Sequence, residues 1–262
     1  MRLVRVYYPL DIPEQGSLVL DKASSHYIQQ VLRLAPGHQI CLFNGNNREH
    51  LVEIIDANKH HTTVLIQHSQ YVDRESPLAL SLYQGLAKGK KMDVICQKAT
   101  ELGISELHPM ITERCVMQLK QERSDKRLAH WQAILQSACE QCGRNVIPQI
   151  YPPEDLASCL QQPSDHTLCL LLNPDATHSI PFSELKLSED TRQIALFVGP
   201  EGGFSPGEID KILAHGAISI QCGPRILRTE TAALVALSIL QFQFGDFSRL
   251  TRCDRGDDSA TL

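Results

Sequence analysis

Three segments of the chain place proline, glycine and charged residues where a buried strand is expected to end. The apolar run before Gly199 is followed by "GPEGGF", the run before Cys222 is followed by "GPRILRTETA", and a third run ends at Asn173-Pro174. Glycine exposes backbone N–H and C=O groups and tolerates positive φ, and proline fixes the direction in which a loop leaves its strand. Because ligands of open α/β sheets bind at the carboxyl ends of strands, we expect one cleft lined by backbone groups. Such groups suit the edge of a purine and the hydroxyls of a ribose.

Each of the two glycine-proline loops is expected to lead into a helix. Ser205, Pro206 and Glu208 follow the pattern of a capping box with proline in the first turn, and His215-Gly216 ends that helix. Thr229 is a candidate N-cap of the last helix, "TETAALVALSILQFQF", which is apolar on nearly every face.

The remaining elements divide the chain into two domains. Residues 1–72 contain short β-like runs, a hairpin signal at Asn44-Gly45 and one helix, "SSHYIQQVLRL", with Ser24 or Ser25 as N-cap. The polar segment 73–77, "DRESP", is the expected linker. After it, strands alternate with helices up to residue 247, which predicts a mostly parallel sheet covered on both faces. Residues 248–262 lack apolar periodicity and are predicted to be a flexible tail.

Several common classes of protein are disfavoured because the sequence lacks their motifs. It has no G-x-G-x-x-G at its first βα unit, no P-loop and no G-x-S-x-G elbow. Nine cysteines at scattered spacing, with no export signal, predict free thiols and a cytoplasmic protein. The single CxxC, Cys139 to Cys142, lies in a predicted helix without a second pair, so packing is favoured over a metal or redox role and no metal is predicted. No apolar run is long enough to span a membrane.

The charge of the chain does not by itself decide whether its partner is a nucleic acid. The formal net charge is −5, yet basic clusters lie between residues 73 and 130, in "AKGKKMD" and "KQERSDKR". These clusters are consistent with phosphate contacts and equally with solvated helix faces.

The two glycine-proline motifs, "LFVGPEGGFSPGEID" and "GPRILRTETAALVAL", resemble the signature pair of the RsmE family, the bacterial 16S ribosomal RNA uridine-N3 methyltransferases. The resemblance continues in "GLAKGKKMDVICQKATELGISELHPMITERC", "HWQAILQSACEQCGRNVIP" and "SHYIQQVLRLAPGHQICLFNG", and so extends to about Asp246. Departures are small: "VYYPL" stands where an aromatic-rich run is common, and Cys222 stands where leucine is frequent.

The resemblance implies an α/β fold with two named domains. Residues 1–72 are expected to form a PUA-like β-barrel that holds RNA, and residues 73–247 a SPOUT methyltransferase domain with a trefoil knot. The implied methyl donor is S-adenosylmethionine, with S-adenosylhomocysteine as product. The implied partners are 16S ribosomal RNA or the small ribosomal subunit and a second copy of the chain, and the apolar last helix agrees with a homodimer.

The resemblance and the loop chemistry together nominate three sets of site residues. Backbone groups are expected to hold the cofactor at Leu172, Gly199, Gly202, Gly203, Cys222, Ile226 and Leu227. The candidates for the reacting end are the charged loop residues, ranked Arg228, Glu201 and Glu230, because N3 of uracil must lose a proton as it attacks the methyl group. RNA contacts are expected from the basic residues Arg2, Arg5, Arg33, Lys88, Lys90 and Lys91.

Other functions remain open at this point. A methyltransferase of the same fold acting on transfer RNA fits the same motifs. A non-catalytic RNA-binding module would not need intact glycine loops with charged neighbours. A nucleotide-binding oxidoreductase is disfavoured by the missing dinucleotide fingerprint.

Overall fold

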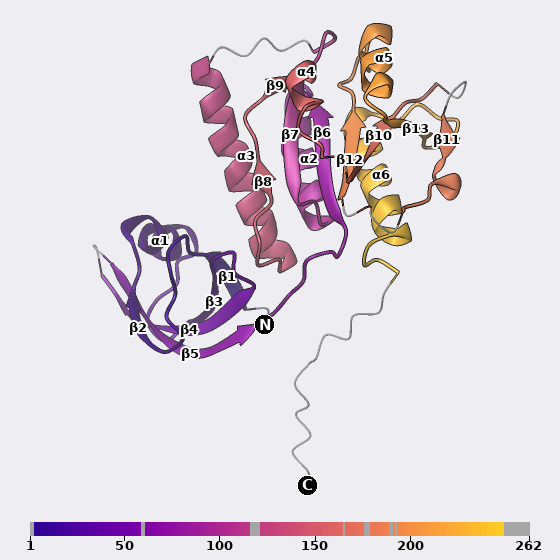
Figure 1. The fold of residues 1–262 in the computed structure, drawn as a ribbon. Coiled ribbons are helices and arrows are strands. Elements are labelled where there is room, and N and C mark those ends of the chain that lie inside the picture. The colour runs from indigo at the N-terminus through magenta and orange to yellow at the C-terminus, as the bar shows by residue number, and fades with distance from the viewer. Residues whose placement is uncertain are drawn as a thin grey trace.

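The computed structural model describes residues 3–58, 61–115, 121–164, 166–175, 179–188, 191 and 193–248, with the backbone alone for 121–123. Two domains are visible, joined by the segment before residue 79 (Figure 1). The prediction for the tail beyond residue 248 and the candidate Arg2 lie outside the described residues.

The N-terminal domain is a five-stranded sheet in the order β1-β3-β4-β5-β2. Its strands are β1 (Val4–Tyr7), β2 (Gly16–Val19), β3 (Gln39–Phe43), β4 (Arg48–Ala57) and β5 (Thr62–Tyr71). The predicted hairpin is confirmed: β3 and β4 pair antiparallel around Asn44-Gly45, and Gly45 has a φ of +96°. Alternate residues such as Ile40, Val52 and Val64 fill the core of this domain.

The one helix of this domain begins earlier than predicted and changes type. Helix α1 (Lys22–His26) is capped by Asp21, whose carboxylate accepts from the Ser24 N–H at 2.7 Å, so neither Ser24 nor Ser25 is the N-cap. Residues Tyr27–Val31 then form a π-helical turn. Its wider turn departs from the 3.6-residue period of an α-helix, and Val31 at its end is 61% exposed.

The C-terminal domain contains an eight-stranded sheet in the order β11-β13-β10-β12-β6-β7-β8, with β9 beside β7. All strand pairs recorded in this sheet are parallel. The strands are β6 (Ala79–Gly85), β7 (Glu106–Ile111), β8 (Gln149–Ile150), β9 (Glu154–Asp155), β10 (Thr167–Leu172), β11 (Ile180–Pro181), β12 (Gln193–Val198) and β13 (Ile218–Gln221). The predicted mostly parallel α/β sheet is therefore confirmed.

Helices cover both faces of this sheet. They are α2 (Lys91–Glu101), α3 (Gln121–Cys142), α4 (Leu156–Cys159), α5 (Pro206–Ala214) and α6 (Thr229–Gln243), with a 3-10 turn at Phe182–Glu184. One core joins Leu80 and Leu82 of β6 to Ile95 of α2 and Leu237 of α6. A second core joins strand residues such as Phe197 to Leu156 of α4 and Ile212 of α5 on the opposite face.

The start of α5 shows how local sequence positions a loop of the site. The Ser205 hydroxyl accepts from the Glu208 N–H, and the Glu208 carboxylate accepts from the Ser205 N–H, which confirms the capping box. The other oxygen of Glu208 accepts from the backbone N–H of Glu113 at 2.8 Å. Glu208 is 3% exposed, so one buried carboxylate ties the "GPEGGF" loop to the turn that follows β7.

A charged cluster around one nearly buried carboxylate joins the two domains. The Glu49 carboxylate on β4 accepts from both Arg5 on β1 and Arg74 in the linker. Arg5 also donates to the Asn145 side chain at 2.6 Å, and Arg74 donates to the carbonyl of Gly143 at 2.9 Å. Arg74 therefore anchors the predicted linker to the N-terminal domain through Glu49 and to the C-terminal domain through Gly143.

Candidate functional site

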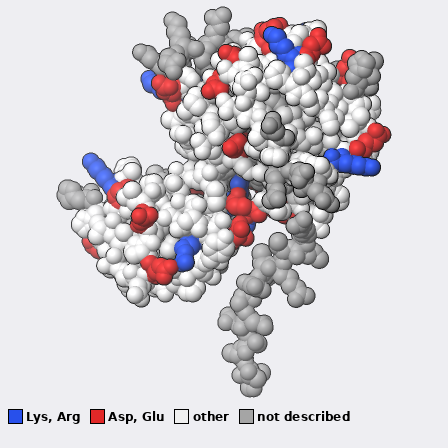
Figure 2. Space-filling model, in the orientation of Figure 1, with Lys and Arg blue, Asp and Glu red and all other residues white. Residues whose placement is uncertain are grey.

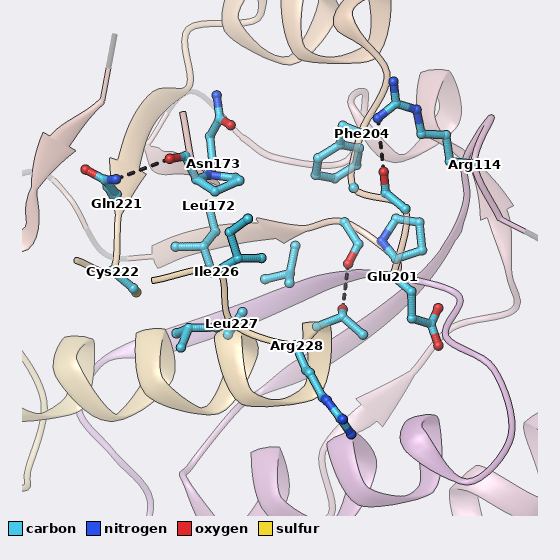
Figure 3. Close-up of a pocket in the computed structure, with 18 of the residues that line it drawn as sticks. Arg114, Leu172, Asn173, Glu201, Phe204, Gln221, Cys222, Ile226, Leu227 and Arg228 are labelled. Carbon is cyan, nitrogen blue, oxygen red and sulfur yellow. Dashed lines mark hydrogen bonds between the residues drawn. The ribbon is translucent and has the colours of Figure 1, made fainter. Parts of the chain in front are cut away.

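The three predicted loops meet at one edge of the parallel sheet. Strands β10, β12 and β13 are neighbours and end there. The ends border a cavity of about 660 Å³ lined by residues 172–174, 198–204, 221–223 and 225–229 (Figure 3). Lys91 and Arg114 also line it. The cleft expected from three separate strand ends is thus a single cavity, of a size typical of small-molecule sites.

All seven residues nominated for cofactor binding line this cavity: Leu172, Gly199, Gly202, Gly203, Cys222, Ile226 and Leu227. Gly203 has a φ of +66°, a backbone conformation that residues with a side chain rarely adopt. The loop is also tightly folded, because a Cβ on Gly199 would lie 3.1 Å from the backbone of Gly203. Ile226 is 88% exposed, so an apolar side chain projects from the cavity wall.

Two hydrogen bonds hold the Gly199 carbonyl from the protein side. The Thr229 hydroxyl donates to it at 2.6 Å, and the Gln84 side-chain amide lies 3.4 Å from it. Thr229 is therefore not the N-cap of α6. That position belongs to Arg228, which makes no side-chain cap. Because the Gly199 carbonyl is occupied, only its N–H remains for a ligand.

The three candidates for the reacting end occupy different places. Arg228 lines the cavity, is exposed, and within the described part of the chain has no recorded ion pair or hydrogen bond of its guanidinium. Its side chain extends away from Ile226 (Figure 3). Glu201 also lines the cavity, whereas Glu230 is not among the lining residues and lies behind Lys91, 3.7 Å from its Nζ.

Glu201 is held as a carboxylate by its neighbours. It accepts from the Lys88 backbone N–H at 2.9 Å and pairs with Lys91 Nζ at 3.0 Å. Burial raises the pKa of the Glu201 carboxyl, but the Lys88 N–H and the Lys91 ammonium outweigh that effect and the net pKa is lowered. A lowered pKa makes Glu201 a weaker base.

Comparison with known proteins decides the family of the chain. Residues 74–241 match the family described as RNA methyltransferase domain, and residues 20–67 match the RNA methyltransferase PUA domain. The ribosomal RNA small subunit methyltransferase E of Buchnera aphidicola (subsp. Schizaphis graminum) is 37% identical over 94% of this chain and 99% of its own length. The chain belongs to the ribosomal RNA small subunit methyltransferase E family.

Other members of the methyltransferase E family agree in sequence and in structure. The Bacillus subtilis member is 31% identical over 88% of this chain and 92% of its own. The Neisseria gonorrhoeae member, bound to S-adenosyl methionine, has a TM-score of 0.86 at 33% identity, covering 94% of this chain and 100% of its own. The Legionella pneumophila protein Lpg2936, in complex with bound SAM, has a TM-score of 0.88 at 38% identity over the same shares. The resemblance read from the motifs is confirmed, and so is a PUA-like domain followed by an α/β domain.

The basic residues predicted to contact RNA lie in different surroundings in the structure. Lys88 and Lys90 are exposed beside the cavity, and Arg33 is exposed in the N-terminal domain. Lys91 lies in the cavity between two carboxylates. On the face drawn in Figure 2, cations are scattered among acidic side chains rather than gathered in one patch.

Arg5 differs from the prediction, since its side chain is only 9% exposed and is bound to Glu49. Its guanidinium also lies 4.6 Å above the centroid of the Phe43 ring. A guanidinium committed to a buried carboxylate and an aromatic ring is not available to a phosphate. Arg5 therefore joins the domains, and its guanidinium is already engaged within the chain.

Three residues around this cavity were not predicted from the sequence. Arg114 donates to the Gly202 carbonyl at 3.0 Å, and Gln84 and Gly85 end the neighbouring strand β6 behind the "GPEGGF" loop. Their only signal was their place in the long motif around "GLAKGKKMD" and "ITERC", because each acts through a contact with a loop far along the chain.

The described residues also bear on metal binding and on membrane insertion. No group of three or more His, Cys, Asp or Glu side chains there is arranged to hold a metal ion. No helix there is long and apolar enough to cross a membrane. The eight described cysteines are free, and Cys139 is buried in a contact with the Val146 carbonyl, which fits a packing role for the CxxC.

Proposed function

We propose that this chain transfers a methyl group from S-adenosylmethionine to N3 of one uridine in 16S ribosomal RNA of the small subunit, in the cytoplasm. The observation that carries the proposal is the cavity in which three backbone-lined loops converge. Family membership supports it, and so do the Neisseria and Legionella structures, which contain this cofactor.

The residues of the cavity fit a nucleoside-containing cofactor. Glycines 202 and 203 let a ligand approach the backbone, and a Cβ on Gly203 would meet nothing within 4 Å. The exposed side chain of Ile226 and the nearby Leu227 and Leu172 offer an apolar wall to a planar ring. When bound, the sulfonium supplies an activated methyl group, and the loops have to align it with the attacking nitrogen.

Arg228 is the favoured residue at the reacting end. Arg228 lines the cavity, and its guanidinium has no partner among the described residues, which suits stabilisation of the negative charge that develops on uracil as N3 loses its proton. Glu201 is less suited to accept that proton because its pKa is lowered. Glu230 acts through Lys91, which it helps to orient.

Replacing Arg228 by alanine is expected to lower turnover by about 100-fold, the usual effect of losing one group that stabilises transition-state charge. Affinity for S-adenosylmethionine should stay unchanged, because no cofactor contact is assigned to the guanidinium. The measurement is single-turnover methylation of 16S ribosomal RNA beside calorimetry of donor binding. Loss of donor binding would place Arg228 in the cofactor site instead.

Arg225→Ala is the matched control, because Arg225 is an exposed arginine on the same cavity wall. An equal loss of turnover in both variants would mean that the arginines contribute general positive charge toward RNA and not a specific interaction with the base.

RNA binding is assigned to the exposed cations Lys88, Lys90 and Arg33, so affinity for RNA should fall as salt rises. The target uridine has to leave its stack to reach the cavity, which favours a looped or single-stranded site. A homodimer is part of the proposal: Ile226, Phe242 and Phe247 are 88%, 63% and 49% exposed and would be covered by a second copy. The trefoil knot stays a prediction from the resemblance.

One comparison of substrates tests the proposal. Ribosomal RNA from a strain lacking the protein should lack one methyl group on uracil by mass spectrometry, and the purified protein should restore it. Labelled donor offered with transfer RNA and with 16S ribosomal RNA distinguishes the alternative substrate. Donor binding without transfer to either RNA would favour a non-catalytic RNA-binding module.

A further inference from the structure

A buried glutamine closes the C-terminal end of β6. On the same face of this strand, Leu80 and Leu82 are fully buried in the main core, and Gln84 is 0% exposed as well. Burying an amide in such surroundings is unfavourable unless its hydrogen bonds are satisfied. A polar residue at an apolar position therefore calls for a specific partner.

The amide nitrogen of Gln84 has three oxygen neighbours from three elements. It donates to the Thr229 hydroxyl at 2.9 Å and to the Gly85 carbonyl at 2.9 Å, and it lies 3.4 Å from the Gly199 carbonyl. The Thr229 hydroxyl in turn donates to the Gly199 carbonyl at 2.6 Å. Two consecutive hydrogen bonds thus run in one direction, from the Gln84 amide to the Thr229 hydroxyl and from that hydroxyl to the Gly199 carbonyl.

The acceptors fix the direction of these hydrogen bonds. Both carbonyls can only accept, and the single hydroxyl proton of Thr229 is directed at Gly199. The Gln84 amide therefore has to present its NH₂ group to them. Its oxygen is left buried with no hydrogen-bond partner among the described residues. The protein accepts the cost of that unsatisfied oxygen, so the two hydrogen bonds that the NH₂ group donates to Thr229 and Gly85 outweigh it.

The start of α6 lacks the usual side-chain N-cap, and its first residue takes part in these hydrogen bonds instead. Its N-cap, Arg228, makes no side-chain cap, although a capping side chain contributes about 1 kcal/mol. The first hydroxyl of the helix, on Thr229, instead reaches across to the carbonyl of Gly199. Departures of this kind concentrate at functional sites.

We propose that Gln84 and Thr229 are positioning residues that set the distance between the two glycine-proline loops of the cavity. Gly199 begins the 199–203 loop, and Thr229 directly follows the 222–228 loop, so their hydrogen bond links the opposite walls. Neither Gln84 nor the Thr229 hydroxyl has to touch the cofactor for this role. The inference rests on the proposed function, because it assigns the linked walls to S-adenosylmethionine binding.

The test compares Thr229→Val with Thr229→Ser. Valine keeps the shape of threonine and removes the hydroxyl, whereas serine keeps the hydroxyl. We expect the Kd for S-adenosylhomocysteine, measured by calorimetry below the unfolding temperature, to rise about 10- to 100-fold in the valine variant, because the two loops lose the hydrogen bond that holds them at the distance the ligand requires. The serine variant should lie within about threefold of the unchanged protein, since it restores the bond.

Gln84→Met provides a second, independent variant. Methionine has similar volume and no donor, so the Kd should rise in the same direction. Thermal unfolding of the free variants separates the roles, because a merely structural residue would lower the unfolding midpoint and leave the Kd of the folded protein unchanged.

Each outcome decides the inference. A weakened valine variant rescued by serine supports it. Equal affinity in the valine variant and the unchanged protein would overturn it, and so would equal weakening by valine and serine, which would indicate packing and not the hydroxyl. If the unchanged protein itself binds no product or donor, the proposed function fails and the positioning role fails with it.

Discussion

Replacing Gly85 by alanine is expected to abolish measurable binding of S-adenosylmethionine. A Cβ at this position would lie 2.5 Å from both Cδ and the backbone nitrogen of Pro200, and 3.0 Å from the carbonyl carbon of Gly199. The proline ring and the backbone cannot turn aside as a flexible side chain would. The added methyl group therefore has to displace the Gly199-Pro200 loop or distort the end of β6.

Either response damages the cavity wall. Overpacking of this kind costs about 1–3 kcal/mol of folding stability, and a displaced loop no longer presents its backbone to the cofactor. The measurements are calorimetric titration with S-adenosylmethionine and thermal unfolding of the free protein. Wild-type affinity in Gly85→Ala would show that the contact with Pro200 does not determine the shape of the cavity.

Gly207→Ala is the matched control for this experiment. Gly207 lies in the first turn of α5, and a Cβ there meets nothing within 4 Å. Alanine at a helical position without strain is expected to leave binding unchanged and to stabilise the protein by about 0.5–1 kcal/mol. The pair separates the effect of a crowded glycine from that of losing any glycine near the site.

Features set by short-range rules could be predicted from the sequence. The Ser205–Glu208 capping box, the Asn44-Gly45 hairpin and the change of period after residue 73 each depend on neighbours a few residues apart. The strand ends at Asn173, Gly199 and Cys222 were predictable for the same reason. A parallel sheet necessarily brings neighbouring carboxyl ends to one edge, so the cavity followed from the fold class.

Features set by contacts between distant segments could not be predicted. Gly85 and Pro200 meet only because β6 and β12 pair. Thr229 has the residue type of an N-cap, but a carbonyl thirty positions earlier in the chain takes its hydroxyl. Arg5 has the charge of a phosphate ligand, and the tertiary fold gives it Glu49 instead. In each case the partner is decided by the topology of the fold and not by neighbouring residues in the chain.

Replacing Glu49 by alanine is expected to lower the free energy of unfolding by about 3–5 kcal/mol, because two arginines would lose one shared, nearly buried carboxylate. The side chains of Glu49 and Arg5 are 10% and 9% exposed. The Arg5 Nε already lacks a partner among the described residues, so removing Glu49 leaves the charge still less compensated. Urea unfolding at neutral pH measures the change.

The exposed pair Glu14–Arg48 supplies the control. Its carboxylate and guanidinium are 71% and 39% exposed, and Glu14→Ala should cost less than about 1 kcal/mol, as for surface ion pairs generally. Equal losses in the two variants would contradict a special role for the cluster between the domains.

The contribution of Glu49 to the free energy of unfolding should also depend on pH. Burial raises the pKa of Glu49, but the hydrogen bonds and charges of Arg74 and Arg5 outweigh it, and the pKa is lowered in the folded protein. A carboxyl with a lowered pKa contributes its full stability above the pKa of an unfolded glutamate, about 4.3, and loses that contribution as pH falls through the folded value. The difference in unfolding free energy between the unchanged protein and Glu49→Gln should therefore be largest near neutral pH and shrink in acid. A difference that stays constant down to pH values below the folded pKa would mean that Glu49 stabilises the junction by shape and not by charge.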